Sequence, residues 1–166
     1  MNWLAQTLGI AVAVLCILSL QAEKRWKILL LSAVANFLSG INYLIFVGFS
    51  SAVLTSVLAV TQTTVNMFKA LNGKKANTTE KVIYLILYAF LGIIAFKKPE
   101  DILVIAASIL FALAVFCKKE QNIRLFMLAN TSLIIVYNLL VSSTNIYSQI
   151  VSFISICIAL IRYRKC

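Results

Sequence analysis

Two amide and two phenol side chains occupy matching places inside long apolar stretches of the sequence. Asn36 is followed two helical turns later by Tyr43, and Asn130 is followed at the same spacing by Tyr137. Both members of a pair then lie on one helix face. An amide can hydrogen-bond a polar solute, and a phenol ring can stack on it. The same amides can instead bond between helices and hold them together, so both interpretations stay open.

A second group of uncharged polar residues extends this candidate site. Thr55, Gln62 and Asn66 form a polar stripe on an otherwise apolar segment. The amides of Gln62 and Asn66 need hydrogen-bond partners, which favours an interior position over a lipid-facing one. Asn138 stands directly beside Tyr137. The candidate substrate-binding residues are Asn36, Tyr43, Gln62, Asn66, Asn130, Tyr137 and Asn138.

Catalytic and metal chemistry are not expected from these residues. The chain has no histidine, and no Asp, Glu, Lys or Arg lies deep in an apolar segment. A nucleophile with its base, or a cluster of metal ligands, needs such side chains. We therefore expect neither an enzyme nor a bound metal or other cofactor. Ion or proton coupling normally leaves an ionisable group inside the membrane, so passive transport is favoured over coupled transport.

The elements that position these residues are predicted to be membrane helices. Hydrophobic residues make up 62% of the chain and charged residues 12%, and the mean hydropathy is +0.99. Ile28 to Phe68 and Leu125 to Ile161 contain no formal charge. As single helices they would be roughly 55 to 60 Å long, about twice the hydrocarbon core of a bilayer, so each must cross the membrane twice. The predicted fold class is an all-α membrane protein.

Charged clusters and small polar turn residues divide the chain into seven predicted transmembrane helices. An odd number of spans puts the two termini on opposite sides of the membrane. The spans are Trp3 to Leu20, Ile28 to Phe46, Ala52 to Phe68, Val82 to Phe96, Ile102 to Phe116, Leu125 to Val141 and Ile146 to Ile161.

The basic residues predict the orientation of these spans. With the N-terminus outside, all of the 15 Lys and Arg residues except Lys97 and Lys98 fall on the inner side. This asymmetry fits the positive-inside rule and places the C-terminus in the cytoplasm. The net charge of +10 is then explained by basic residues that set the orientation of the helices in the membrane. No nucleic-acid partner is expected, because no basic face with base-reading or stacking groups lies outside the lipid.

The two halves of the sequence resemble each other. Aligning them so that Asn130 meets Asn36 also pairs Tyr137 with Tyr43, and the scarce polar residues and loop charges fall in register with the predicted helix ends. A three-helix unit repeated after one linker helix returns in the same orientation. We predict a single integral membrane domain over 1–166, with repeats at about 3–70 and 100–163 and a linker helix at about 81–97.

Three short motifs resemble the YgjV-type bacterial inner membrane proteins. They are Trp3-Leu4-Ala5-Gln6 with Gly9-Ile10, Glu23-Lys24-Arg25-Trp26-Lys27, and Pro99-Glu100-Asp101-Ile102-Leu103. The resemblance covers nearly the whole chain and implies a bacterial inner membrane location and a SWEET-like 3+1+3 fold, because that family is grouped with the SWEET and PQ-loop proteins. The proline-glutamine motif of that wider superfamily is absent here, so hinges would be formed by residues such as Ser39-Gly40.

These features favour a facilitator of a small, polar, uncharged solute, which works by alternating access between two three-helix bundles in the lipid bilayer. The alternative is a non-transporting structural or interaction protein of the inner membrane, whose asparagine and serine residues only hold helices together. A homo-oligomer is compatible with both hypotheses. A water-accessible cavity between the repeats would favour the first hypothesis.

Overall fold

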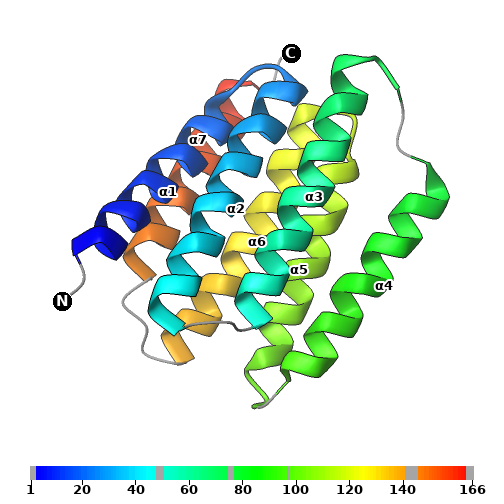
Figure 1. Ribbon diagram of the computed structural model, residues 1–166. Helices are drawn as coiled ribbons and strands as arrows, with labels where there is room; N and C mark the ends of the chain where they lie inside the picture. Colours follow the sequence, from blue (N-terminus) through cyan, green and yellow to red (C-terminus); the bar gives the residue numbers. More distant parts are fainter. Residues whose placement is uncertain (1–2, 48–50, 75–76, 97, 141–145, 164–166) are drawn as a thin grey trace. The chain divides into compact units, whose positions relative to one another are not determined.

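The computed structural model describes residues 3–47, 51–74, 77–96, 98–140 and 146–163. This part of the chain forms seven α-helices and no strand (Figure 1), which confirms the predicted all-helical class and the number of helices. The helices are α1 (Trp3–Gln21), α2 (Arg25–Val47), α3 (Ser51–Leu71), α4 (Thr78–Ala95), α5 (Asp101–Phe116), α6 (Glu120–Leu140) and α7 (Ile146–Arg162).

Two helices begin well before the apolar run that was used to predict them. Helix α2 begins at Arg25 rather than Ile28, and α6 begins at Glu120 rather than Leu125. The predicted spans start later because they were placed after the last charge, whereas the helices continue back through the charged residues that precede it. The consequence is largest in α6, whose second turn now includes Arg124.

Helix α4 shows how a polar segment can start a helix ahead of its apolar residues. The Asn77 side chain accepts a hydrogen bond from the Thr79 backbone N–H at 3.4 Å, and the Glu80 carboxylate accepts one from the Asn77 N–H at 3.3 Å. This reciprocal capping box satisfies two backbone donors that would otherwise lack partners. The helix therefore starts at Thr78, one turn before the predicted Val82.

Residues 1–74 form one compact unit of three helices. Helix α2 packs against both α1 and α3 (Figure 1). The Ser19 hydroxyl of α1 donates to the Ile28 carbonyl at 2.9 Å and lies 2.9 Å from the Ser32 hydroxyl of α2. On the other side of α2, a Cβ atom added to Gly40 would be 3.2 Å from Cβ of Ser56, so small residues bring α2 and α3 close together.

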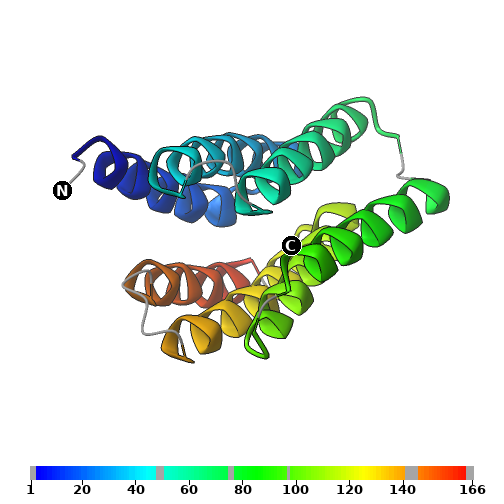
Figure 2. The ribbon, with the colours of Figure 1, turned by 60° about the horizontal axis from the view of Figure 1, so that its bottom comes forward.

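Residues 75–166 form the second compact unit and contain the other four helices. Helix α5 packs against α4 and α6, and α6 also packs against α7, as Figures 1 and 2 show. Aromatic pairs join α4 to α5. Tyr84 and Phe116 have ring centroids 5.9 Å apart, and Tyr88 meets Phe111 edge to face at 6.5 Å. Such pairs add about 0.5–1.5 kcal/mol beyond the area that they bury.

Replacing Gly92 with alanine is expected to destabilise the second unit. A Cβ atom at this position on α4 would be 2.7 Å from Cγ1 of Ile105 on α5, so the helices or the isoleucine must shift. Overpacking of this kind costs about 1–3 kcal/mol. Thermal unfolding in detergent should show a lower Tm for Gly92→Ala.

The matched control for this substitution is Gly9→Ala. There the nearest atom, Nδ2 of Asn42, would lie at an ordinary 3.9 Å, and alanine favours a helix by up to about 1 kcal/mol over glycine. Its Tm should stay constant or rise. Adding Ile105→Ala to Gly92→Ala should restore part of the lost Tm, and equal Tm values for the two glycine variants would contradict the close approach.

The outer faces of the helices are apolar. Large hydrophobic side chains are exposed on each of the seven helices, and Ile93 of α4 and Ile161 of α7 are 70% and 76% exposed. Three of the five buried positions of α5 hold alanine, among them Ala112 and Ala114 at 0%. Apolar outer faces, with small residues where helices meet, are typical of helices in lipid.

By length and apolarity, α6 is the helix in the described part of the chain that suffices to cross a membrane. The segments Thr7–Gln21, Asp101–Phe116 and Gln149–Arg162 are apolar but shorter. Seven spans therefore remain a prediction, whereas seven helices are observed.

Candidate functional site

The most polar buried surface in the first unit lies on α3. Gln62, Thr63 and Asn66 are each 0% exposed. They lie within one helical turn of each other and so share a side of the helix. The opposite side of α3 is exposed and carries large apolar residues, with Val57 at 58% and Phe68 at 56%. This helix thus buries polar residues and exposes apolar ones, the reverse of a helix in a water-soluble protein.

Hydrogen bonds in this group leave the side-chain oxygen of Asn66 available as an acceptor. The Asn66 amide nitrogen donates to the Gln62 carbonyl at 2.9 Å, and the Thr63 hydroxyl donates to the Ala59 carbonyl. Both bonds stay within α3. The Asn66 oxygen Oδ1 is buried and has no hydrogen-bond donor among the described residues. A buried amide oxygen of this kind can accept a hydrogen bond from a hydroxyl or amine.

Asn42 of α2 carries a second such oxygen, and sequence analysis did not select it. Its Oδ1 is also buried without a hydrogen-bond donor in the described chain. The alignment of the two halves pairs Asn42 with Val136, so a search for repeated polar residues passes over it. The feature of the sequence that could have identified Asn42 is its position directly before the predicted site residue Tyr43.

The other predicted residues of the first unit are arranged differently. The Asn36 amide nitrogen donates to the Ser32 carbonyl of its own helix at 2.9 Å, and the residue is only partly buried. Tyr43 belongs to α2, but its side chain lies outside the described residues. Among the described side chains, Asn66 donates a hydrogen bond to another predicted residue, through the Gln62 backbone carbonyl.

In the second unit, Asn130 connects two helices. Its amide nitrogen donates to the Ala107 carbonyl of α5 at 2.6 Å, which is the hydrogen bond that the helix-packing alternative expects. Tyr137 lies near the end of α6 and is partly buried. Asn138 is 6% exposed. The two asparagines that the sequence alignment pairs, Asn36 and Asn130, therefore have different hydrogen-bond partners.

This difference predicts unequal effects of the same substitution. Asn130→Ala removes a hydrogen bond between helices and is expected to destabilise the protein by about 0.6–1.7 kcal/mol. Asn36→Ala removes a bond to its own helix and should have a smaller effect. The Tm values of both variants should be measured in the same detergent. A larger decrease in Tm for Asn36→Ala than for Asn130→Ala would contradict the role of Asn130 in joining α5 to α6.

A buried cation was also missed by sequence analysis. Arg124 was expected in the basic segment before the sixth helix, but it lies in α6 and is 1% exposed. Its guanidinium carbon is 4.5 Å from the centroid of the Tyr163 ring, and the Gln121 amide donates to the Tyr163 carbonyl. The acidic residue Glu120 in the first turn was the available signal of an earlier helix start.

No group of three or more His, Cys, Asp or Glu side chains that could hold a metal ion occurs within the described ranges. The arrangement that these residues offer is a set of uncharged hydrogen-bonding groups inside apolar helices. Such groups are better suited to bind a polar solute than to catalyse a reaction.

The all-helical fold, the apolar outer faces and the buried polar residues define a helical membrane protein. A family model described as "Bacterial inner membrane protein", Imp-YgjV, matches residues 3–166. The chain belongs to this family, which confirms the resemblance found in the three sequence motifs. No curated protein sequence and no solved structure matches the chain significantly.

Proposed function

We propose that this inner membrane protein is a passive facilitator for a small, polar, uncharged solute. The single observation that carries the proposal is Asn66, fully buried on α3 with an acceptor oxygen that no described residue satisfies. Burying such a group costs about 1–3 kcal/mol. A solute that donates a hydrogen bond would offset this cost while it is bound.

The proposed site consists first of the buried polar face of α3, with Gln62 and Asn66, and of Asn42 on α2. Asn36, Tyr43, Asn130, Tyr137 and Asn138 are proposed to contribute as the two three-helix bundles, α1 to α3 and α5 to α7, give alternating access. In this proposal all seven helices span the membrane, with the N-terminus outside and the C-terminus in the cytoplasm.

Passive transport is proposed because the apolar segments carry no charged residue at mid-depth. The charged residues of the sequence lie in the loops or near helix ends, and the most interior, Arg124, belongs to the second turn of α6. Coupling to an ion gradient normally uses an ionisable group within the membrane. The same distribution supports the proposal that the protein is not an enzyme.

A second function is supported by other contacts. The Ser19–Ser32 pair and the Asn130–Ala107 hydrogen bond join helices within their units, as a non-transporting structural or interaction protein of the inner membrane would require. Transport is preferred because the buried Asn66 oxygen Oδ1 accepts no hydrogen bond from the part of the chain that the structure describes.

A solute screen on the full chain tests the proposal. Detergent-purified protein is heated with panels of neutral polyols, sugars and amides, and with charged amino acids as a comparison class. A bound solute raises stability by RT ln(1 + [L]/Kd), about 2.7 kcal/mol at a hundredfold excess over Kd. We expect stabilisation by neutral donors and flux into proteoliposomes that is unchanged when a proton gradient is imposed.

Two results would count against transport. If no solute raises the Tm and none enters proteoliposomes faster than in protein-free vesicles, the structural alternative is favoured. Flux that follows the proton gradient would overturn the passive mechanism while keeping transport.

A further inference from the structure

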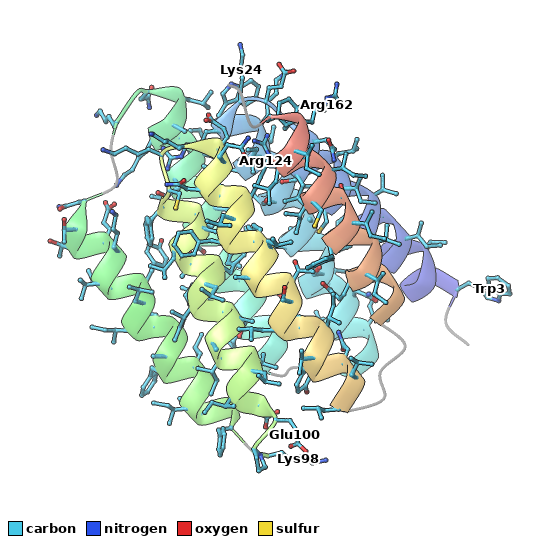
Figure 3. The ribbon with its side chains drawn as sticks, turned by 180° about the vertical axis from the view of Figure 1, so that it is seen from behind. Trp3, Lys24, Lys98, Glu100, Arg124 and Arg162 are labelled. Carbon is cyan, nitrogen blue, oxygen red and sulfur yellow. The ribbon has the colours of Figure 1, made fainter. Side chains whose placement is uncertain are left out.

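A cluster of cations lies at one end of the second unit. Lys118 and Lys119 in the α5–α6 turn are exposed, and so is Arg162 at the end of α7. Figure 3 shows Arg124 and Arg162 at this end, and Lys98 with Glu100 at the opposite end of the same unit. We call the four residues Lys118, Lys119, Arg124 and Arg162 the basic cluster.

Side-chain contacts hold the basic cluster together. The Gln121 amide, which follows the two lysines, donates to the Tyr163 carbonyl and so joins the α5–α6 turn to the end of α7. Two guanidinium groups lie against the Tyr163 ring. The Cζ atom of Arg124 is 4.5 Å from the ring centroid and that of Arg162 is 5.4 Å from it. Arg124 is 1% exposed, whereas Arg162 is exposed. The buried arginine thus fixes the ring against which the exposed arginine rests.

The charge of this cluster is not balanced by its neighbours in sequence. Glu120 is the one acidic residue between Phe116 and the end of the chain, against four cations in the cluster, and the sequence continues with Arg164 and Lys165. Arg162 is exposed beside the Tyr163 ring, so its guanidinium can also contact a group outside the protein. Arginine and lysine together are the usual ligands of phosphate groups.

We propose that the basic cluster binds the phosphate headgroup of an anionic phospholipid. Arg162, Lys118 and Lys119 would contact the phosphate, and Arg124 would position them through Tyr163. A lipid is favoured over a soluble phosphate because the helices that carry the cluster expose apolar side chains next to it. Leu125 is 57% exposed and Ile161 is 76% exposed, so acyl chains can pack on the residues that adjoin the cations. Basic pockets at helix ends bind anionic lipids in this way.

The site does not depend on transport. It would strengthen anchoring of the second unit in the leaflet that contains anionic lipid, and a protein of the structural class would use it equally well.

The experiment compares lipid retention by four forms of the full chain in detergent with added phosphatidylglycerol or phosphatidylcholine, measured by native mass spectrometry. Arg162→Gln removes one exposed cation of the cluster. Lys98→Gln removes the same charge from the opposite end of the unit, and Lys74→Gln removes an exposed cation from a basic loop of the first unit. All three positions are exposed, so the variants should fold.

We expect wild type to retain phosphatidylglycerol in preference to phosphatidylcholine. Arg162→Gln should weaken retention about fivefold, the effect of one basic residue near an anionic membrane surface, while Lys98→Gln and Lys74→Gln should retain lipid like wild type. Equal retention of the two lipids, or equal losses in Arg162→Gln and Lys74→Gln, would overturn the site in favour of general charge attraction. Displacement of the lipid by an equal concentration of inorganic phosphate would overturn its assignment to a lipid.

Discussion

Replacing Asn66 with leucine is expected to reduce solute flux about tenfold or more while the protein remains at least as stable as wild type. Leucine has the same branched shape and number of side-chain heavy atoms as asparagine but lacks the amide oxygen, which is buried without a donor among the described residues. Removing the unsatisfied acceptor relieves a cost of about 1–3 kcal/mol, and losing the bond from Asn66 to the Gln62 carbonyl costs about 0.5–1.5 kcal/mol, so the Tm should not fall. A lost hydrogen bond to the solute has a similar magnitude, which corresponds to about tenfold in affinity.

Flux into proteoliposomes and thermal unfolding in detergent separate the two effects. Thr61→Val is the matched control. Thr61 is an exposed polar residue of the same helix, and its hydroxyl donates to the Val57 backbone carbonyl one turn earlier. It should leave both flux and Tm unchanged. If Asn66 only held helices together, Asn66→Leu would lower the Tm. Unchanged flux in Asn66→Leu would remove this residue from the solute site.

The helices could be predicted from the sequence because charges are rare and mark helix ends. Their starts could not be placed to the residue, since capping and interfacial side chains extend helices into charged segments. Asn77 with Glu80 starts α4 ahead of its apolar residues, and Glu120 lies in the first turn of α6. Both helix starts lie in polar segments outside the apolar runs. The length of an apolar run therefore does not indicate where either helix begins.

The candidate site was predictable in part. The amides of Gln62 and Asn66 were expected in the interior because they need partners, and both are fully buried. The alignment of the two halves, by contrast, could not predict hydrogen-bond partners. Asn36 bonds to its own helix and Asn130 to its neighbour, because partners depend on helix rotation and spacing, which residue identity at paired positions does not determine.

Truncating Arg124 to alanine is expected to destabilise the protein by about 2–4 kcal/mol, more than the loss of any exposed charge. Its guanidinium stacks on Tyr163 away from water, where a cation–π contact contributes about 2 kcal/mol. The alanine variant also loses the packing of the long aliphatic stem and leaves a cavity between α6 and α7. Unfolding in detergent free of anionic lipid measures this effect without a contribution from headgroup binding.

Arg162→Ala is the matched comparison, because both arginines contact one ring and differ in burial. Arg162 is exposed and lies 5.4 Å from the ring centroid, so its contact is screened by water and its loss should cost less than about 1 kcal/mol. Arg124→Lys should give an intermediate value, since lysine keeps the charge but not the planar stacking. If the two alanine variants lose equal stability, burial does not strengthen the contact, and the Arg124–Tyr163 pair is not what holds the start of α6 to the end of α7.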